Sequence, residues 1–178
     1  MYIKILLNIL FIITLTLIQG GFINGLPLMF PNINLLLIVL IYVLVLGGFC
    51  LAGIWAISMG FILDTISFLP FGTFLISFSL SLIIINFLLV NFFTNRSLYA
   101  YIALTFFGSV SLFVSVYIFS VANQILGVKG QLDLFNLGFW QNGFMQIIGN
   151  ILVVLFSFYV INFLSNNLKP VFLLKRKS

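Results

Sequence analysis

Four long runs of the chain carry no charged side chain and consist mostly of apolar residues. Each run could cross the roughly 30 Å hydrocarbon core of a bilayer as one helix, because a helix rises about 1.5 Å per residue. A soluble domain would carry about a quarter of its residues as charges, whereas this chain has 7 basic and 2 acidic residues among 178. The sequence therefore predicts an all-α integral membrane protein with a single membrane domain. The four runs are 5–23, 73–93, 98–121 and 144–164.

A fifth uncharged stretch, 33–63, does not fit a single span. As one helix it would be about 46 Å long, which is too long to cross a bilayer without extreme tilt. Gly47-Gly48 lies at its middle, and two glycines weaken a helix and permit a tight turn. We therefore expect two short helices near 33–46 and 49–64, either as thin spans or as a re-entrant hairpin covered by other helices. The total is then a six-transmembrane-helix bundle.

The basic residues predict which way six spans face. With the N-terminus in the cytoplasm, only Lys129 lies outside and six basic residues lie inside, as the positive-inside rule requires. Treating 33–63 as one span would place the C-terminal basic cluster outside. We expect a multi-pass protein with both termini cytoplasmic and a basic tail, 165–178, that contacts anionic membrane lipid. The inside residues are Lys4, Arg96, Lys169, Lys175, Arg176 and Lys177.

A cleaved signal peptide is the alternative interpretation of the N-terminus, since Lys4 precedes an apolar stretch. Gln19-Gly20-Gly21 is a poor cleavage site, and removal of this helix would leave five spans with the wrong charge distribution. We expect the first helix to be retained. The basic residues form no patch interleaved with aromatic side chains, so the sequence predicts no nucleic-acid partner.

The residue inventory excludes several kinds of chemistry. The chain has no His and no Glu; its acids are Asp64 and Asp133, and its cysteine is Cys50. His-based triads, Cys/His zinc sites and a disulfide framework are therefore excluded, and phosphate-binding and dinucleotide-binding motifs are absent from the sequence. We expect no catalytic residue, no cofactor and no metal.

Asp64 is the one acid at a membrane span, and an ionisable group in lipid is costly enough to be a functional candidate. It ends a row of small residues, Ala52, Ala56 and Gly60, which recur at i+4 steps and let another helix approach closely. A proton or ion relay would need a second ionisable group within the membrane. We therefore interpret Asp64 as a structural carboxylate that accepts hydrogen bonds from backbone amides or hydroxyls of the following loop.

Two further groups of residues attract attention. Asn142, Gln146 and Asn150 form a polar row at i+4 spacing, for which internal packing between helices is favoured over a ligand site. The outside segment 122–142 is an amphipathic mixture that is expected to lie at the membrane interface with Trp140 as an anchor. Its apolar face is also a candidate partner surface, formed by Leu134, Phe135, Phe139 and Trp140.

The pattern from Pro31-Asn32 through Tyr42 to Gly60-Phe61-Ile62-Leu63-Asp64 and Gly72 resembles the rod-shape-determining membrane protein family MreD. The motif-bearing part covers roughly residues 31–80. The chain departs from the family pattern at Gly53, which stands seven residues before Gly60, and at Gly47-Gly48, which replaces the usual basic residues. The resemblance assigns interface or fold-holding roles to Asp64, Gly60, Ala56, Gly72, Pro31, Asn32, Tyr42 and Asn150.

The resemblance implies a non-catalytic membrane subunit of the bacterial cell-elongation complex, in the cytoplasmic (inner) membrane. Proteins similar to this one support rod shape and lateral peptidoglycan synthesis. They bind an MreC-like bitopic periplasmic scaffold, and through it connect actin-like MreB filaments with wall-synthesis enzymes.

The family is also similar in fold to the substrate-binding subunits of energy-coupling-factor transporters, which supplies the main alternative. Such a subunit would bind a vitamin in a pocket that opens to the outside and is lined by converging polar groups. The row Ala52, Ala56 and Gly60 could serve docking in either case. An integral enzyme such as a phospholipid synthase is a third class, which the absence of paired acids and His disfavours.

Overall fold

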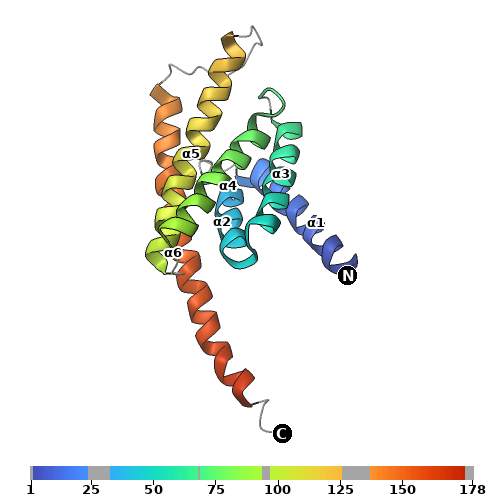
Figure 1. Cartoon of the computed structure of the whole chain (residues 1–178), viewed down its shortest axis with the longest axis vertical. Coiled ribbons are helices and arrows are strands. Elements are labelled where there is room, and N and C mark those ends of the chain that lie inside the picture. Colours follow the sequence, from blue (N-terminus) through green and yellow to red (C-terminus); the bar gives the residue numbers. More distant parts are fainter. Residues whose placement is uncertain (1, 24–32, 68, 94–96, 126–136, 175–178) are drawn as a thin grey trace.

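The computed structural model describes residues 2–23, 33–67, 69–93, 97–125 and 137–174. These residues form six α-helices and one π-helical turn (Figure 1). The elements are α1 (Tyr2–Leu17), the π-helical turn η1 (Ile18–Ile23), α2 (Leu35–Gly47), α3 (Phe49–Ile66), α4 (Thr73–Asn91), α5 (Leu98–Ile125) and α6 (Leu137–Leu174).

The described part of the chain is helical, as the apolar runs predict. Four helices, α3 to α6, contain stretches that are long and apolar enough to cross a membrane, and two shorter apolar helices precede them. The molecule therefore has the composition and architecture of a helical membrane protein. The 13 residues of α2 form a helix about 20 Å long at about 1.5 Å per residue. This is shorter than the roughly 30 Å hydrocarbon core of a bilayer.

The turn between α2 and α3 lies where the sequence predicts it. Gly48 has φ +85° and separates the two helices, and its amide still donates to the carbonyl of Leu44 at 3.0 Å. Residues with a Cβ rarely adopt this backbone conformation, so glycine is the residue suited to the turn. The prediction of two short helices in 33–64 is confirmed.

The predicted ends of the last two helices were wrong. α5 continues to Ile125 instead of ending at 121, and α6 covers Leu137–Leu174 instead of 144–164. Segment 122–142 is therefore partly helical, as is the tail expected at 165–178. Apolarity marks the depth of the membrane and not the end of a helix, because a helix satisfies its own backbone and can continue into water.

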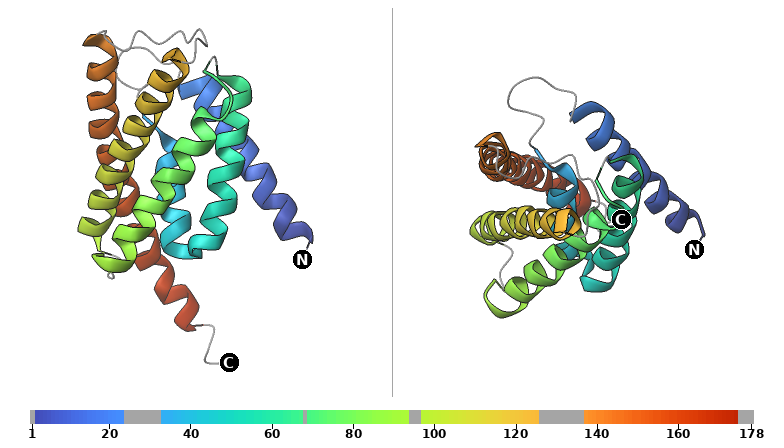
Figure 2. Two further views of the ribbon diagram at one scale, coloured as in Figure 1. Left: turned by 45° about the horizontal axis from the view of Figure 1, so that its top comes forward. Right: turned by 90° about the horizontal axis from the view of Figure 1, so that it is seen from above.

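α2 lies at the centre of the bundle and contacts all five other helices. Leu36, Leu40 and Ile41 are fully buried within it, and none of its 13 residues is charged. A helix that is apolar on every side suits the interior of a bundle as well as contact with lipid. Around it, α3 packs on α4, α4 on α5 and α5 on α6, as the view from above shows (Figure 2).

α6 lies at one edge of this arrangement. Its C-terminal half projects beyond the rest of the bundle, at the end where the N-terminus also lies (Figures 1 and 2). The N-terminal half of α6 lies beside α5 at the opposite end. α6 thus covers the bundle only along part of its length.

Candidate functional site

The carboxylate of Asp64 caps the N-terminus of α4. Its Oδ2 accepts hydrogen bonds from the amides of Gly72 and Leu75, both at 3.0 Å, and its Oδ1 accepts one from the amide of Phe74 at 2.8 Å. The first amides of a helix have no partner within the helix, and the helix dipole favours a negative charge beside them. Asp64 is 5% exposed. The predicted hydrogen bonding of this carboxylate to the backbone that follows is confirmed.

Two glycines allow this cap to form. Gly72 is the N-cap residue of α4 and has φ +97°, in the left-handed region. A Cβ on Gly60 would lie 2.6 Å from the Cα of Leu75 and 3.0 Å from its amide nitrogen. Because Gly60 has no side chain, α3 approaches the first turn of α4 closely enough for Asp64 to reach its amides.

The row of small residues on α3 lies inside the molecule. Ala52 and Ala56 are fully buried, and Gly60 is buried against α4. The expectation that this row serves docking of another protein is therefore not supported by its position, because the chain's own helices cover it. These small residues do allow helices to approach closely, but the helices concerned belong to this chain.

A second polar cluster caps the start of α2. Asn34 is its N-cap residue, with Oδ1 accepting from the amide of Leu37 at 3.1 Å. Gln19 of the π-helical turn accepts from the amide of Leu35 at 2.9 Å and donates to the carbonyl of Ile33 at 2.8 Å. These two side chains satisfy backbone groups at the start of the central helix, which other helices shield from water.

Asn150 joins this cluster to α5 and α6. Its Oδ1 accepts from the amide of Asn34 at 2.8 Å, and its Nδ2 donates to the hydroxyl of Ser109 at 2.9 Å. The side chain is fully buried. The predicted bridging between helices is therefore confirmed for Asn150. It lies 13 residues into α6, about 20 Å along that helix, so α2 begins well inside the bundle, far from the end at which α6 starts.

Tyr42 connects the central helix with α5 and α6. Its hydroxyl lies 2.8 Å from the hydroxyl of Ser157, and its ring stacks on Tyr101 with the ring centres 4.9 Å apart. The residues that carry the family resemblance and that the structure describes thus make contacts within the chain. Pro31 and Asn32 lie outside the described residues.

The rest of the polar row on α6 behaves differently from Asn150. Asn142 and Gln146 line a cavity of about 220 Å³ between α5 and α6, and among the described residues neither side chain has a hydrogen-bond partner. Asn34, at the start of α2, lines the same cavity. Apolar side chains complete the lining, with Gly143, and these are Phe74, Leu112, Phe113, Val116 and Phe139.

An aromatic cluster joins the C-terminal half of α5 with the N-terminal end of α6. Phe139 stacks on Phe113 with the ring centres 4.9 Å apart. The ring centre of Trp140 lies 5.4 Å from that of Tyr117 and 5.7 Å from that of Phe113. These contacts stabilise the first turns of α6, which explains why this helix begins earlier than predicted. Trp140 is nevertheless 52% exposed. The other two residues of the predicted partner surface, Leu134 and Phe135, lie outside the described residues.

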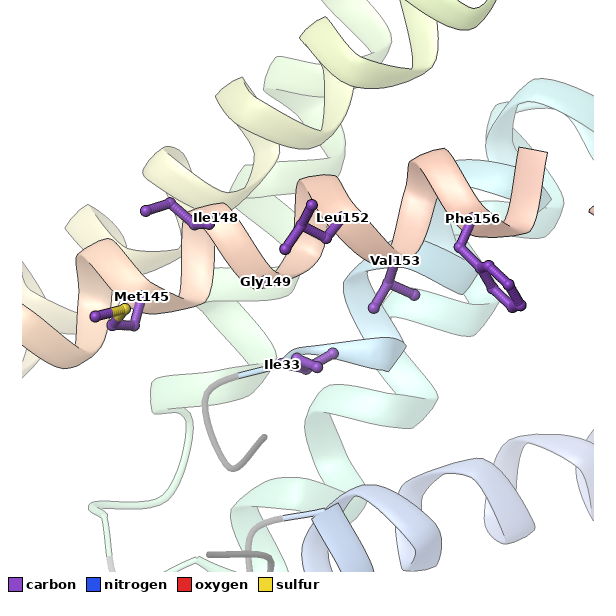
Figure 3. A pocket seen from close by; sticks show the side chains of 7 residues that line it. All are labelled: Ile33, Met145, Ile148, Gly149, Leu152, Val153 and Phe156. Atoms are coloured by element: carbon purple, nitrogen blue, oxygen red, sulfur yellow. The ribbon is translucent and has the colours of Figure 1, made fainter. Parts of the chain in front are cut away.

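A neighbouring face of α6 forms an apolar groove with the start of α2 (Figure 3). Its volume is about 380 Å³. Gly149 lies at the point of closest approach, where a Cβ would meet the side chain of Ile33 at 3.1 Å. The groove is lined by Ile33, Met145, Ile148, Gly149, Leu152, Val153 and Phe156.

Sequence reasoning missed Gln19, Asn34 and Ser109 as members of the polar cluster. The cost of burying an amide in an apolar span was the signal available for Gln19, since such a group needs a partner. The identity of its partner depends on the depth at which α2 begins, which no local pattern contains. In the described part of the chain, no group of three or more His, Cys, Asp or Glu side chains could hold a metal ion.

Comparison of the chain with models of known protein families, with curated proteins and with solved structures gives no match.

Proposed function

We propose that the chain is a non-catalytic membrane subunit of the bacterial cell-elongation complex, similar to MreD. In this proposal a six-helix bundle crosses the inner membrane with both termini in the cytoplasm. It binds the membrane helix of an MreC-like bitopic scaffold, and thereby supports rod shape and lateral peptidoglycan synthesis together with MreB filaments and wall-synthesis enzymes.

The surface of α6 is the observation that carries this proposal. Only 17% of the most apolar 18-residue stretch of α6 is buried, compared with 39% in α3 and 33% in both α4 and α5. Leu152 and Phe156 are 60% and 73% exposed beside the groove of Figure 3. A long apolar helix with an open groove suits a second membrane helix, which associates with it through close packing.

The use of Asp64 within the fold supports a non-catalytic role. Both carboxylate oxygens accept hydrogen bonds from backbone amides at the start of α4, so this group is occupied in holding α3 and α4 together. Gly60, Ala56, Asn150 and Tyr42 likewise make internal contacts. Partner binding then falls to α6 and to the aromatic cluster at its outer end.

A vitamin-binding subunit of an energy-coupling-factor transporter is the second candidate. It is favoured by the cavity between α5 and α6, because polar side chains converge there at one end of the bundle. This second proposal includes a fold similar to that of the energy-coupling-factor subunits. A transporter subunit would associate with a pair of ATPases and a transmembrane coupling subunit.

Affinity purification from gently solubilised bacterial membranes tests the two candidates against each other. We expect the tagged chain to recover a bitopic periplasmic coiled-coil protein and wall-synthesis enzymes. Recovery of ATPases with a coupling subunit instead would establish the transporter candidate and contradict the first.

Matched variants locate the partner surface. Leu152→Ala with Phe156→Ala is expected to lower recovery of the scaffold about tenfold, whereas Ile83→Ala with Phe87→Ala on the exposed side of α4 should leave it unchanged. If the α6 pair and the α4 pair of substitutions gave equal recovery of the scaffold, the α6 groove would be excluded as the binding surface. A reporter fused after Ser178 is expected to signal a cytoplasmic location, and an external signal would contradict the six-span topology.

A further inference from the structure

We propose that the cavity between α5 and α6 binds a small, neutral, planar molecule that carries an amide or lactam group. The inference stands whichever of the two candidate functions is correct, because it depends only on the side chains that line this cavity. Under the predicted topology the cavity lies in the outer half of the bundle, opposite the N-terminus.

The first argument is the set of carboxamides that the cavity brings together. Asn142 and Gln146 are one helical turn apart on α6, and among the described residues neither has a hydrogen-bond partner. Polar side chains in a membrane helix normally face protein and bond to a neighbouring helix. Asn142 is exposed and Gln146 is half-buried, so both amides are free to bond to a molecule that enters the cavity.

Asn34 is the third carboxamide and is held rigidly in place. Its backbone amide donates to Asn150 and its Oδ1 accepts from the amide of Leu37. The Nδ2 group has no partner among the described residues, although the residue is only 7% exposed. This group is the donor that a ligand carbonyl would satisfy at the inner end of the cavity.

The walls of the cavity determine the shape and charge of the ligand. Phe74, Phe113 and Phe139 line it, and none of the described residues that line it is ionisable. Phenyl faces favour a flat ring, and a charged group would lack an opposite charge among these side chains. A volume of about 220 Å³ is below the roughly 300–1,000 Å³ of sites for drug-sized ligands, so the ligand is expected to contain one ring.

Carboxamides both donate and accept hydrogen bonds. A molecule with an amide or lactam edge offers the complementary pair of groups in one plane. The same three side chains would accommodate a carboxylate less well, because their amide groups can donate to it but none of the lining residues supplies a counter-charge.

Ligand-observed NMR on the full chain in lipid nanodiscs tests the proposal, with benzamide and uracil as neutral probes and benzoate as the charged counterpart of benzamide. We expect saturable binding of at least one neutral probe above that of empty discs, and about tenfold weaker binding of benzoate. Absence of binding by both neutral probes, or equal binding of benzamide and benzoate, would overturn the proposal.

Variants show whether the probe occupies this cavity. Asn142→Leu with Gln146→Leu is expected to weaken binding about tenfold, since both hydrogen-bonding groups are lost. The matched control is Asn91→Leu, which removes an exposed carboxamide from the far end of α4 and should leave binding unchanged. Equal affinities of the wild type and the cavity variant would place the probe elsewhere and overturn the proposal.

Gly143→Ala provides an independent variant that keeps all three amides. Its Cβ would lie 2.3 Å from Cε2 of Phe113, so the ring must move and the cavity must change shape. We expect weaker probe binding by this variant also, with helicity and monodisperse elution as checks of folding. Unchanged binding by a folded Gly143→Ala would contradict occupation of the space beside Phe113.

Discussion

The turn between α3 and α4 and the cavity between α5 and α6 use polar side chains in opposite ways. At the turn, the carboxylate of Asp64 accepts three backbone amides and is 5% exposed. In the cavity, among the described residues, Asn142 and Gln146 have no hydrogen-bond partner. Asn142 is exposed and Gln146 is half-buried, so neither amide is enclosed by the fold. The first region is therefore completed by the fold itself, whereas the second is left open to a molecule from outside.

Loss of the Asp64 carboxylate is expected to have the largest effect on stability. Asp64→Ala leaves three amides at the buried start of α4 without a partner, and charge-assisted hydrogen bonds contribute about 1.5–3 kcal/mol each, although not additively. We expect the free energy of unfolding to fall by at least about 3 kcal/mol. Unfolding in mixed detergent micelles, followed by tryptophan fluorescence, measures the change.

Asp64→Asn is the companion of this variant. It retains one acceptor oxygen and is expected to lose less stability than Asp64→Ala, but still more than about 1 kcal/mol. In a shape-complementation assay, both variants should restore rod shape less well than the wild type. The less stable Asp64→Ala should restore it least. If both behaved as the wild type in stability and in complementation, Asp64 would not be the residue that holds α3 and α4 together.

Gly60→Ala tests the close approach that the cap requires. The new Cβ would lie 2.6 Å from a backbone atom of α4, and backbone cannot rotate away as a side chain can. A loss of about 2 kcal/mol is expected. Gly53→Ala on the same helix is the control, because nothing lies within 4 Å of its Cβ, and it should be neutral or stabilising by up to about 1 kcal/mol. If the two substitutions changed the free energy of unfolding equally, helix propensity alone would explain the effect of Gly60→Ala, and the close approach of α3 and α4 would not.

The turn is also the region that the sequence predicts best. The carboxylate of Asp64 is followed within eleven residues by the amides that it caps, so the residues involved are close in the chain. The turn at Gly48, between α2 and α3, is local in the same sense. The interpretation of Asp64 as a structural carboxylate needed only the rule that a helix start lacks partners for its amides. Helix existence followed from apolarity in the same way.

The cavity and the start of α2 were not predictable in this way. Asn150 and Asn34 are 116 residues apart, and Asn150 and Ser109 are 41 apart, so their contacts depend on the depth at which α2 enters the bundle. The i+4 spacing of Asn142, Gln146 and Asn150 shows that they share a face. It does not show that only the last of them meets another helix.

Asn150→Leu is expected to cost less than the changes at the turn. The substitution leaves the amide of Asn34 and the hydroxyl of Ser109 without their partner, while the number of side-chain heavy atoms is kept. Buried hydrogen bonds between membrane helices average about 0.6 kcal/mol, and an unpaired buried donor costs about 1–3 kcal/mol. We therefore expect the free energy of unfolding to fall by about 1–2 kcal/mol. Ser109→Ala should cost less, because the Asn34 bond remains.

The smallest effects are expected for Asn142→Leu and Gln146→Leu. Because among the described residues these amides have no partner, their replacement by an apolar side chain should change the free energy of unfolding by less than about 0.5 kcal/mol. The comparison with Asn150→Leu is internal to one helix and removes the same chemical group each time. If either substitution destabilised the protein as much as Asn150→Leu does, that amide would be a structural group, and the contrast between a closed turn and an open cavity would fail. If both leave stability unchanged while probe binding is lost, the carboxamides on this part of α6 are retained for a ligand and not for the fold.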